Sequence, residues 1–147
     1  TYARVVPDDE TGLELRGGMG YARSIVDEWT TTVNGVKRDF SGKRLPWAPD
    51  LTYNVGVGYT HETGLFAQVD LFGAGKQYFD AENTLSDNGY QTINAQIGYH
   101  GDNWDVSLWG KNVLDARYAT KKLASAGQTI VEDGAPMTLG VSVGWRF

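Results

Sequence analysis

The sequence has 147 residues, 19 of them glycine, and no cysteine, which excludes disulfides, thiolate metal sites and cysteine nucleophiles. Its formal net charge of −5 argues against a general nucleic-acid binder, because binding to phosphates needs a basic surface. No run approaches the ~18 consecutive apolar residues of a membrane-spanning helix, so that element is excluded as well.

The first half of the sequence alternates between strand-like and loop-like segments. Residues 1–6 have the pattern of a strand already under way and no signal peptide precedes them, so the sequence is expected to be a fragment. A polar turn over residues 7–12 leads into a predicted strand over residues 13–26, where apolar residues alternate with charged and small ones. Residues 27–50 carry Asn-Gly and Pro-x-x-Pro turn signals and are predicted to be a long loop, with a strand extension over residues 30–33.

From residue 51 onward the two-residue period of a strand is clearer. A predicted strand over residues 51–60 is followed by His61–Gly64, which has the length and composition of a hairpin turn. Long polar loops are expected over residues 80–89 and 115–134. The remaining strands are predicted over residues 65–79, 91–100, 104–114 and 136–147, and a tight turn at 100–103 joins the second of these to the third.

The order of connections and the chemistry of the two faces indicate a membrane barrel. Short turns and long loops alternate, which places all short turns at one end of the sheet, as in outer-membrane barrels. The apolar faces of the strands hold no charge, whereas Asp70, Asp105, Lys111 and Arg146 fall on the opposite face. A soluble barrel would need the reverse, with a dry apolar interior. The alternative for the last strand taken alone is an ordinary strand that ends a soluble β-domain.

We therefore predict an all-β fold, an antiparallel transmembrane β-barrel with meander topology, of which this sequence supplies about seven strands. Because single-chain bacterial barrels have an even strand number, an odd count with an incomplete first strand again indicates a fragment. An aromatic girdle is expected near the strand ends, although burial of rings in a soluble sandwich would give the same placement. Its predicted members are Tyr53, Tyr59, Tyr99, Trp104 and Trp145.

Several segments resemble the C-terminal third of TonB-dependent outer-membrane receptors and follow that family's order. Gly42–Pro49 resembles the Gly-(Asn/Lys)-Arg-x-Pro-x-x-Pro stretch, and Tyr78–Asn83 is similar to a loop of ferric-siderophore receptors of the pesticin and yersiniabactin kind. Trp109–Tyr118 resembles the family's Asn-Leu-Phe-Asp-x-x-Tyr stretch, with Val-Leu in place of Leu-Phe. Gly134–Thr138 is similar to its Gly-x-Pro-Arg stretch, with Met in place of Arg, and the terminal Phe147 is that of a closing strand.

The resemblance implies energised uptake through a 22-stranded barrel in the bacterial outer membrane. Residues 1–147 would be the C-terminal part of a single barrel domain, and the plug and the TonB contact would lie outside this sequence. The three long loops would be extracellular, and the stretch Asn112–Tyr118 would be a structural element whose Asn and Asp side chains bond to the backbone. The resemblance also implies a recognition signal for the barrel-assembly machinery in the last strand, at Val143, Trp145 and Phe147.

Ligand contacts are expected in the outer loops, because siderophore complexes are often anionic and rich in aromatic groups. The alternative is that these mixed-charge loops are merely solvated or contact lipopolysaccharide phosphate. No cofactor and no resident metal are expected, and nucleic acid is not an expected partner. The candidate contacts are Arg44, Trp47, Lys76, Tyr78, Tyr90, Arg117 and Lys121.

Motifs for enzymatic chemistry fail on their spacing. His61 and His100 lie in predicted turns without triad or metal spacing, Gly73–Gln77 lacks the remainder of a phosphate loop, and Asp80–Asn83 lacks the glycine of a calcium loop. The sequence therefore predicts a TonB-dependent receptor for a ferric siderophore or a similarly scarce nutrient, without enzymatic activity. The alternative is a self-contained small outer-membrane barrel with a structural or adhesin role.

Overall fold

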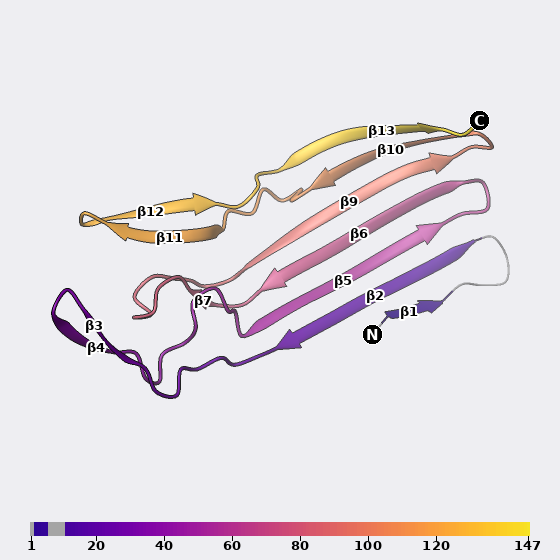
Figure 1. The fold of residues 1–147 in the computed structure, drawn as a ribbon. Coiled ribbons are helices and arrows are strands. Elements are labelled where there is room, and N and C mark those ends of the chain that lie inside the picture. The colour runs from indigo at the N-terminus through magenta and orange to yellow at the C-terminus, as the bar shows by residue number, and fades with distance from the viewer. Residues whose placement is uncertain (1, 6–10) are drawn as a thin grey trace.

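The computed structural model describes residues 2–5 and 11–147, and every regular element in this part of the chain is a β-strand. Seven antiparallel strands form one sheet in the order β1-β2-β5-β6-β9-β10-β13, so that each strand pairs with the next long one along the chain (Figure 1). The strands are β1 (Tyr2–Val5), β2 (Gly12–Tyr21), β5 (Leu51–Thr60), β6 (Leu65–Ala74), β9 (Tyr90–His100), β10 (Trp104–Lys111) and β13 (Thr138–Trp145).

Three short two-stranded pairs lie beyond one end of this sheet, on the left in Figure 1. They are β3 (Thr30–Val33) with β4 (Val36–Asp39), β7 (Gln77–Tyr78) with β8 (Ser86–Asp87), and β11 (Ala119–Ser125) with β12 (Gln128–Asp133). The opposite end carries the tight turns after β5 and β9. The predicted alternation of short turns and long loops is therefore confirmed, and the predicted strand extension at residues 30–33 is β3.

Several predicted boundaries were wrong. The strand predicted over residues 13–26 ends at Tyr21. One further ladder bond joins the Ala22 amide to the Asp50 carbonyl. The next residue on the partner strand is Pro49, which has no N–H and cannot continue the ladder. The strands predicted to reach residues 79 and 114 end at Ala74 and Lys111. The segment 115–134 was predicted to be a loop but contains the hairpin β11–β12. The predicted turn at 7–12 lies mostly outside the described residues.

The register places all-apolar and polar rows on opposite faces of the sheet. One cross-strand row, running from β2 to β13, consists of Leu15, Val57, Val69, Ala95, Gly110 and Leu139. The neighbouring row, one residue along each strand, includes Arg16, Gly56, Asp70 and Asn94. Because successive side chains point to opposite faces, the first row belongs to an apolar face and the second to a polar one.

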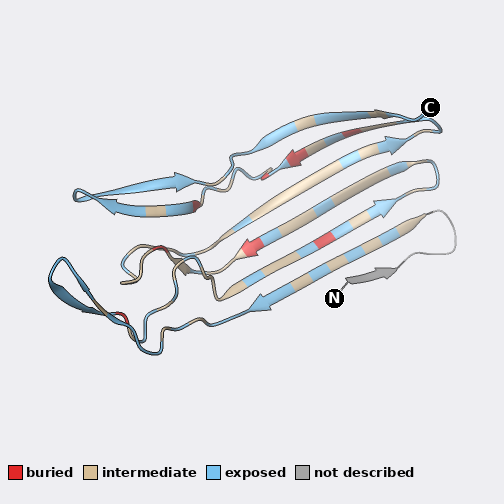
Figure 2. Ribbon diagram, viewed as in Figure 1, coloured by how far each residue is buried: buried red, intermediate tan, exposed pale blue. Residues whose placement is uncertain are grey.

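Among the residues that the structure describes, the sheet has no hydrophobic core of its own. Figure 2 shows that most of it is exposed or intermediate, and the apolar face includes exposed side chains such as Val141 and Val143. Aromatic residues mark the turn end of this face, where Trp104 lies opposite Trp145 and stacks with Tyr99 at 5.5 Å between ring centroids. An uncovered apolar face with aromatic strand ends is the arrangement of a membrane-spanning wall.

On the polar face, Arg16 reaches across β5 to Asp70 at 3.0 Å, passing over Gly56. A Cβ at Gly56 would overlap Asp70 Oδ1 and lie 3.0 Å from Arg16 Nε, whereas a Cβ at Gly58 would have Glu14 Cβ as its nearest neighbour at 3.7 Å. We expect Gly56→Ala to cost about 1–2 kcal/mol by displacing this pair, and Gly58→Ala to change stability by less than about 0.5 kcal/mol. The midpoint temperature for loss of the compact, fast-migrating form on gels measures both variants, and equal midpoints would contradict the steric argument.

Candidate functional site

Three of the seven candidate contact residues lie together at the loop end of the sheet. The Trp47 amide donates to the Tyr78 carbonyl at 2.8 Å, which joins the first long loop to β7. The Lys76 ammonium lies 5.0 Å from the centroid of the Tyr78 ring. The backbone of Trp47 is thus joined to Tyr78, whose ring lies beside Lys76, although the two segments are some thirty residues apart in the sequence. We call these three residues the aromatic patch.

The backbone at Trp47 is held in an uncommon conformation. Its φ is +56° and its side chain is 56% exposed, between Pro46 and Pro49. A bulky residue in the left-handed region costs about 1–3 kcal/mol and persists only where the surrounding structure requires it. Here the hydrogen bond to the Tyr78 carbonyl holds it. The backbone that carries the indole is therefore fixed, and the indole is exposed to solvent.

Arg44 is already engaged within the protein. Its guanidinium pairs with Asp50, and both side chains are largely covered. Its backbone is clamped by Asn83, whose Oδ1 accepts from the Arg44 amide at 2.7 Å and whose Nδ2 donates to the Arg44 carbonyl at 2.9 Å. Arg44 and Asn83 therefore tie the first long loop to the second.

The other candidates do not join the aromatic patch. Tyr90, at the start of β9, stacks on Tyr118 with centroids 3.9 Å apart, which ties the sheet to the third long loop. Arg117 is 76% exposed and lies 3.4 Å from the Asp115 carboxylate. Lys121 is exposed on β11. The structure thus separates the aromatic patch from Arg44 in the first long loop, Tyr90 on β9, and Arg117 and Lys121 in the third long loop.

The sequence analysis missed a small hydrophobic core among the loops. Phe79 is 2% exposed, and with Phe40 and Ala119 it forms the buried apolar set of the described residues. Lys122 crosses this core, donating to the Ser86 carbonyl at 2.7 Å, pairing with Asp87 at 3.5 Å and lying 5.7 Å from the Phe79 ring centroid. We call the three long loops, around residues 27–50, 80–89 and 115–134, together with the contacts between them, the loop platform. Isolated phenylalanines within polar loops are the sequence signal that could have indicated it.

An open hollow of about 400 Å³ lies on the loop platform, over Phe40 and Phe79. Arg38 and Glu82 form an ion pair at 2.5 Å on its rim, and both side chains are about half exposed. Exposed pairs of this kind are worth at most about 1 kcal/mol, so this rim can rearrange at small cost. The apolar floor and the balanced rim charges suit a ligand group that is largely apolar.

Asp80 holds the turn between Phe79 and Leu85. Its carboxylate accepts from the Leu85 amide at 2.7 Å and from the Thr84 hydroxyl and amide at 2.8 and 3.1 Å. Burial opposes the charged form, but these hydrogen bonds outweigh it and hold the pKa of Asp80 below its ordinary value. The carboxylate thus serves the loop backbone, as expected for an Asx turn.

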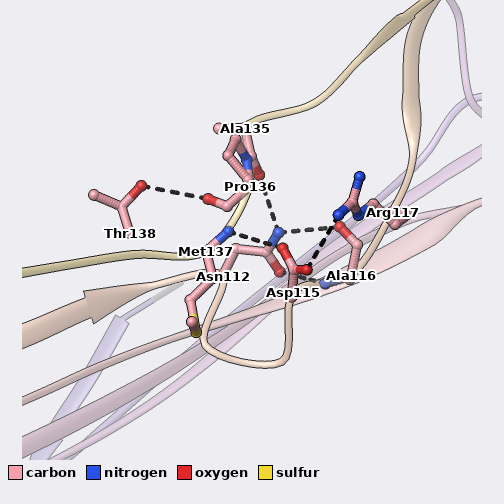
Figure 3. A network of polar contacts seen from close by, with 8 residues as sticks. All are labelled: Asn112, Asp115, Ala116, Arg117, Ala135, Pro136, Met137 and Thr138. Atoms are coloured by element: carbon pink, nitrogen blue, oxygen red, sulfur yellow. Dashed lines mark hydrogen bonds and ion pairs between the residues drawn. The ribbon is translucent and has the colours of Figure 1, made fainter.

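Asn112 organises the end of β10, as Figure 3 shows. Its Nδ2 donates to the carbonyls of Ala116 and Ala135 at 3.0 Å, and its Oδ1 accepts from the Ala116 amide at 2.9 Å. Asp115 accepts from the Met137 amide at 3.0 Å, and this bond lowers the pKa of Asp115. The predicted structural role of this stretch, with Asn and Asp side chains bonded to the backbone, is confirmed.

The residues of the predicted assembly signal lie in and directly after the last strand, β13. Val143 and Trp145 lie on the apolar face of β13, opposite Val106 and Trp104, and Phe147 follows the strand. Their recognition by the assembly machinery stays a prediction. In the described part of the chain, no helix is long and apolar enough to cross a membrane. Over the same residues, no group of three or more His, Asp or Glu side chains is placed to hold a metal ion.

Comparison with known proteins places this geometry in context. The family model described as "TonB dependent receptor-like, beta-barrel" matches residues 5–113. The pesticin receptor of Yersinia pestis is 23% identical, over 91% of this chain and 21% of its own length. The siderophore receptor PiuA from Acinetobacter baumannii superposes with a TM-score of 0.75 at 20% identity, covering 90% of this chain and 20% of that one. The ferric yersiniabactin uptake receptor FyuA from Yersinia pestis gives 0.70 at 18%, covering 91% and 20%. The chain spans about a fifth of the length of these relatives.

Proposed function

The chain belongs to the TonB-dependent receptor-like β-barrel family, and from this we propose that it forms part of a receptor that takes up a ferric siderophore. Proteins of this family are β-barrels of the bacterial outer membrane, and that is the location of this chain. Its relatives named above are receptors. In the proposal, residues 1–147 are one part of a single barrel domain, and a plug and the contact with TonB lie in other segments.

The observation that carries the siderophore proposal is the aromatic patch. Trp47 is exposed and its backbone is bonded to Tyr78, and Lys76 and Tyr78 supply a cation and a phenol in the same part of the loops. Aromatic faces and a cation complement a ferric chelate that is anionic and rich in aromatic or conjugated groups. Because the backbone that carries the indole is already held, binding loses little backbone entropy there.

The proposed orientation puts the long loops outside the cell and the tight turns in the periplasm. The ligand would be captured at the loops and pass inward when TonB acts on the plug, with binding and transport but no covalent chemistry. Lipid and lipopolysaccharide would contact the apolar face and its outer rim, and the assembly machinery would act on β13. Of these proposals, ligand capture has the most direct residue-level test.

We expect Trp47→Ala to weaken binding of the transported chelate about 10- to 100-fold, in the range of a lost aromatic hot spot. Lys76→Gln should have a smaller effect in the same direction, and Lys43→Gln, an exposed loop lysine outside the aromatic patch, should have none. The measurement is binding and uptake of radioactive ferric chelates of the catecholate, phenolate, hydroxamate and carboxylate classes by cells whose only siderophore receptor is the native protein containing this chain.

The energised step of the proposed uptake can be tested in the same cells. A protonophore or loss of TonB should abolish accumulation of the iron while surface binding persists. If accumulation continues without TonB, or if none of the four chelate classes binds, the siderophore proposal fails. If Trp47→Ala and Lys43→Gln bind equally well, the receptor function can stand but the aromatic patch is not its contact surface.

A further inference from the structure

The hairpin β11–β12 leaves one long backbone edge open. On its inner side β11 is fastened to β8, because Lys122 contacts Ser86 and Asp87 and the Ala119 amide lies 3.4 Å from the Asp87 carboxylate. On the other side, among the described residues, β12 has β11 as its one partner strand. Figure 1 shows β12 and β13 running along the same margin of the molecule.

The first four residues of β12 lack the features that normally protect an open edge. All six residues of β12 are exposed, including Ile130 at 57% and Val131 at 47%, and its first four residues, Gln-Thr-Ile-Val, carry no charge, proline or glycine. By contrast β4, the second strand of the other projecting hairpin, reads Val-Lys-Arg-Asp. Charges of that kind discourage pairing with another strand, and an apolar β-prone edge without them favours it.

The neighbouring strand β13 requires a partner in the membrane. Among the described residues its one neighbour is β10, and an open sheet edge cannot face lipid because its amide and carbonyl groups would remain unbonded. In a closed barrel a further strand must therefore lie along Thr138–Trp145. β12 precedes β13 by only four residues, 134–137, so a strand that continues outward past Thr138 runs alongside β12.

We propose that the open edge of β12 is a docking edge for the strand that closes the barrel against β13. The outward continuation of that strand adds to β12 as a third strand, so that the barrel seam stays paired beyond the membrane. This inference follows from the barrel architecture and is independent of which ligand the receptor takes up.

The hairpin geometry identifies the amides that would form these bonds. Ala126 and Gly127 have φ values of +49° and +78°, and Ser125 pairs with Gln128 across them, as in a two-residue hairpin turn of type I′. The Gln128 amide is then turned toward β11 by the turn hydrogen bond. Because directions alternate along an antiparallel ladder, the amides of Thr129 and Val131 point to the open side.

Residue-resolved hydrogen exchange on the native protein in detergent micelles tests this directly. The amides of Thr129 and Val131 should exchange about 100-fold more slowly than the amide of Lys37, which has the equivalent outward position on β4. Exchange of all three at a similar rate would overturn the proposal. Protection of Thr129 and Val131 that disappears on dilution would assign the edge to a second copy of the protein and also overturn it.

Proline variants give an independent test. Val131→Pro removes an outward N–H that β11 does not use, a change that a free edge tolerates. We expect it to increase exchange along β12 at least tenfold, whereas Lys37→Pro on β4 should leave its hairpin intact. Ile130→Pro, which removes an inward N–H, is the control that must loosen β11–β12 in either case. If Val131→Pro is as well tolerated as Lys37→Pro, the edge is free, and siderophore uptake can still be assayed separately in the same cells.

Discussion

Replacing Asn112 with alanine is expected to raise the rate of local opening around residues 112–118 and 135–137 by a factor that corresponds to about 3 kcal/mol. Asn112 is 4% exposed. Its side chain forms hydrogen bonds with three backbone groups, the carbonyls of Ala116 and Ala135 and the amide of Ala116. Each buried backbone group that loses its partner costs about 1–3 kcal/mol, and water can compensate for only some of them at this depth. Hydrogen exchange of these amides in the native protein measures the effect.

The backbone conformation separates two contributions at this position. Asn112 has φ +48°, a region that asparagine and glycine adopt more readily than alanine. Asn112→Gly should therefore lose the hydrogen bonds but not the backbone preference, and it should be less damaging than Asn112→Ala by about 1 kcal/mol. Asn103→Ala, an exposed position in the turn before β10, serves as the matched control and should be neutral. If Asn112→Ala and Asn103→Ala opened alike, the network in Figure 3 would have no energetic role.

The strands of the sheet could be predicted because each is specified by its own sequence. In β5, apolar and small residues alternate without interruption from Leu51 to Thr60, and the tight turn at His61–Gly64 fixes the register with β6. Since consecutive long strands are also spatial neighbours, no distant information was needed to order them. The boundaries were less predictable, because β2 ends where its partner β5 runs into Pro49, a feature of the other strand.

The two projecting hairpins illustrate the limit of local signals. Asn34-Gly35 is a strong hairpin signal and led to the correct prediction of β3, whereas Ala126-Gly127 is a weak one and β11–β12 was missed. Alanine adopts a positive φ at Ala126 only because the flanking strands pair. Tertiary pairing here prevails over a poor local preference.

The candidate site was harder to predict because charge in a sequence does not reveal whether a group is free. Arg44 was predicted as a ligand contact from its charge and loop position, and that contact stays a prediction; the structure shows Arg44 paired with Asp50 and bonded to Asn83, a residue from another loop. Arg38 and Lys122, which were not among the seven, have partners more than thirty residues away. Contacts between loops depend on how the barrel wall brings their ends together.

Replacing Phe79 with alanine is expected to disrupt the loop platform while leaving the barrel wall folded. Phe79 is the most buried side chain among the described apolar residues, and removal of such a phenylalanine typically costs about 3–5 kcal/mol. The loss would also remove the ring beneath Lys122 and the floor of the hollow. Exchange should increase throughout residues 79–87 and 119–133, whereas amides in the middle of β5, β6 and β9 should keep their protection.

Phe72→Ala provides the matched control, since Phe72 is an exposed phenylalanine on the polar face of β6, and its removal should change loop exchange little. The comparison decides between two views of these loops. If they were independent solvated connections, Phe79→Ala would alter only its own turn and chelate binding would be unchanged. If they are a preorganised receptor surface, the variant must order these loops again at each binding event, and its affinity for the ferric chelate should fall at least tenfold.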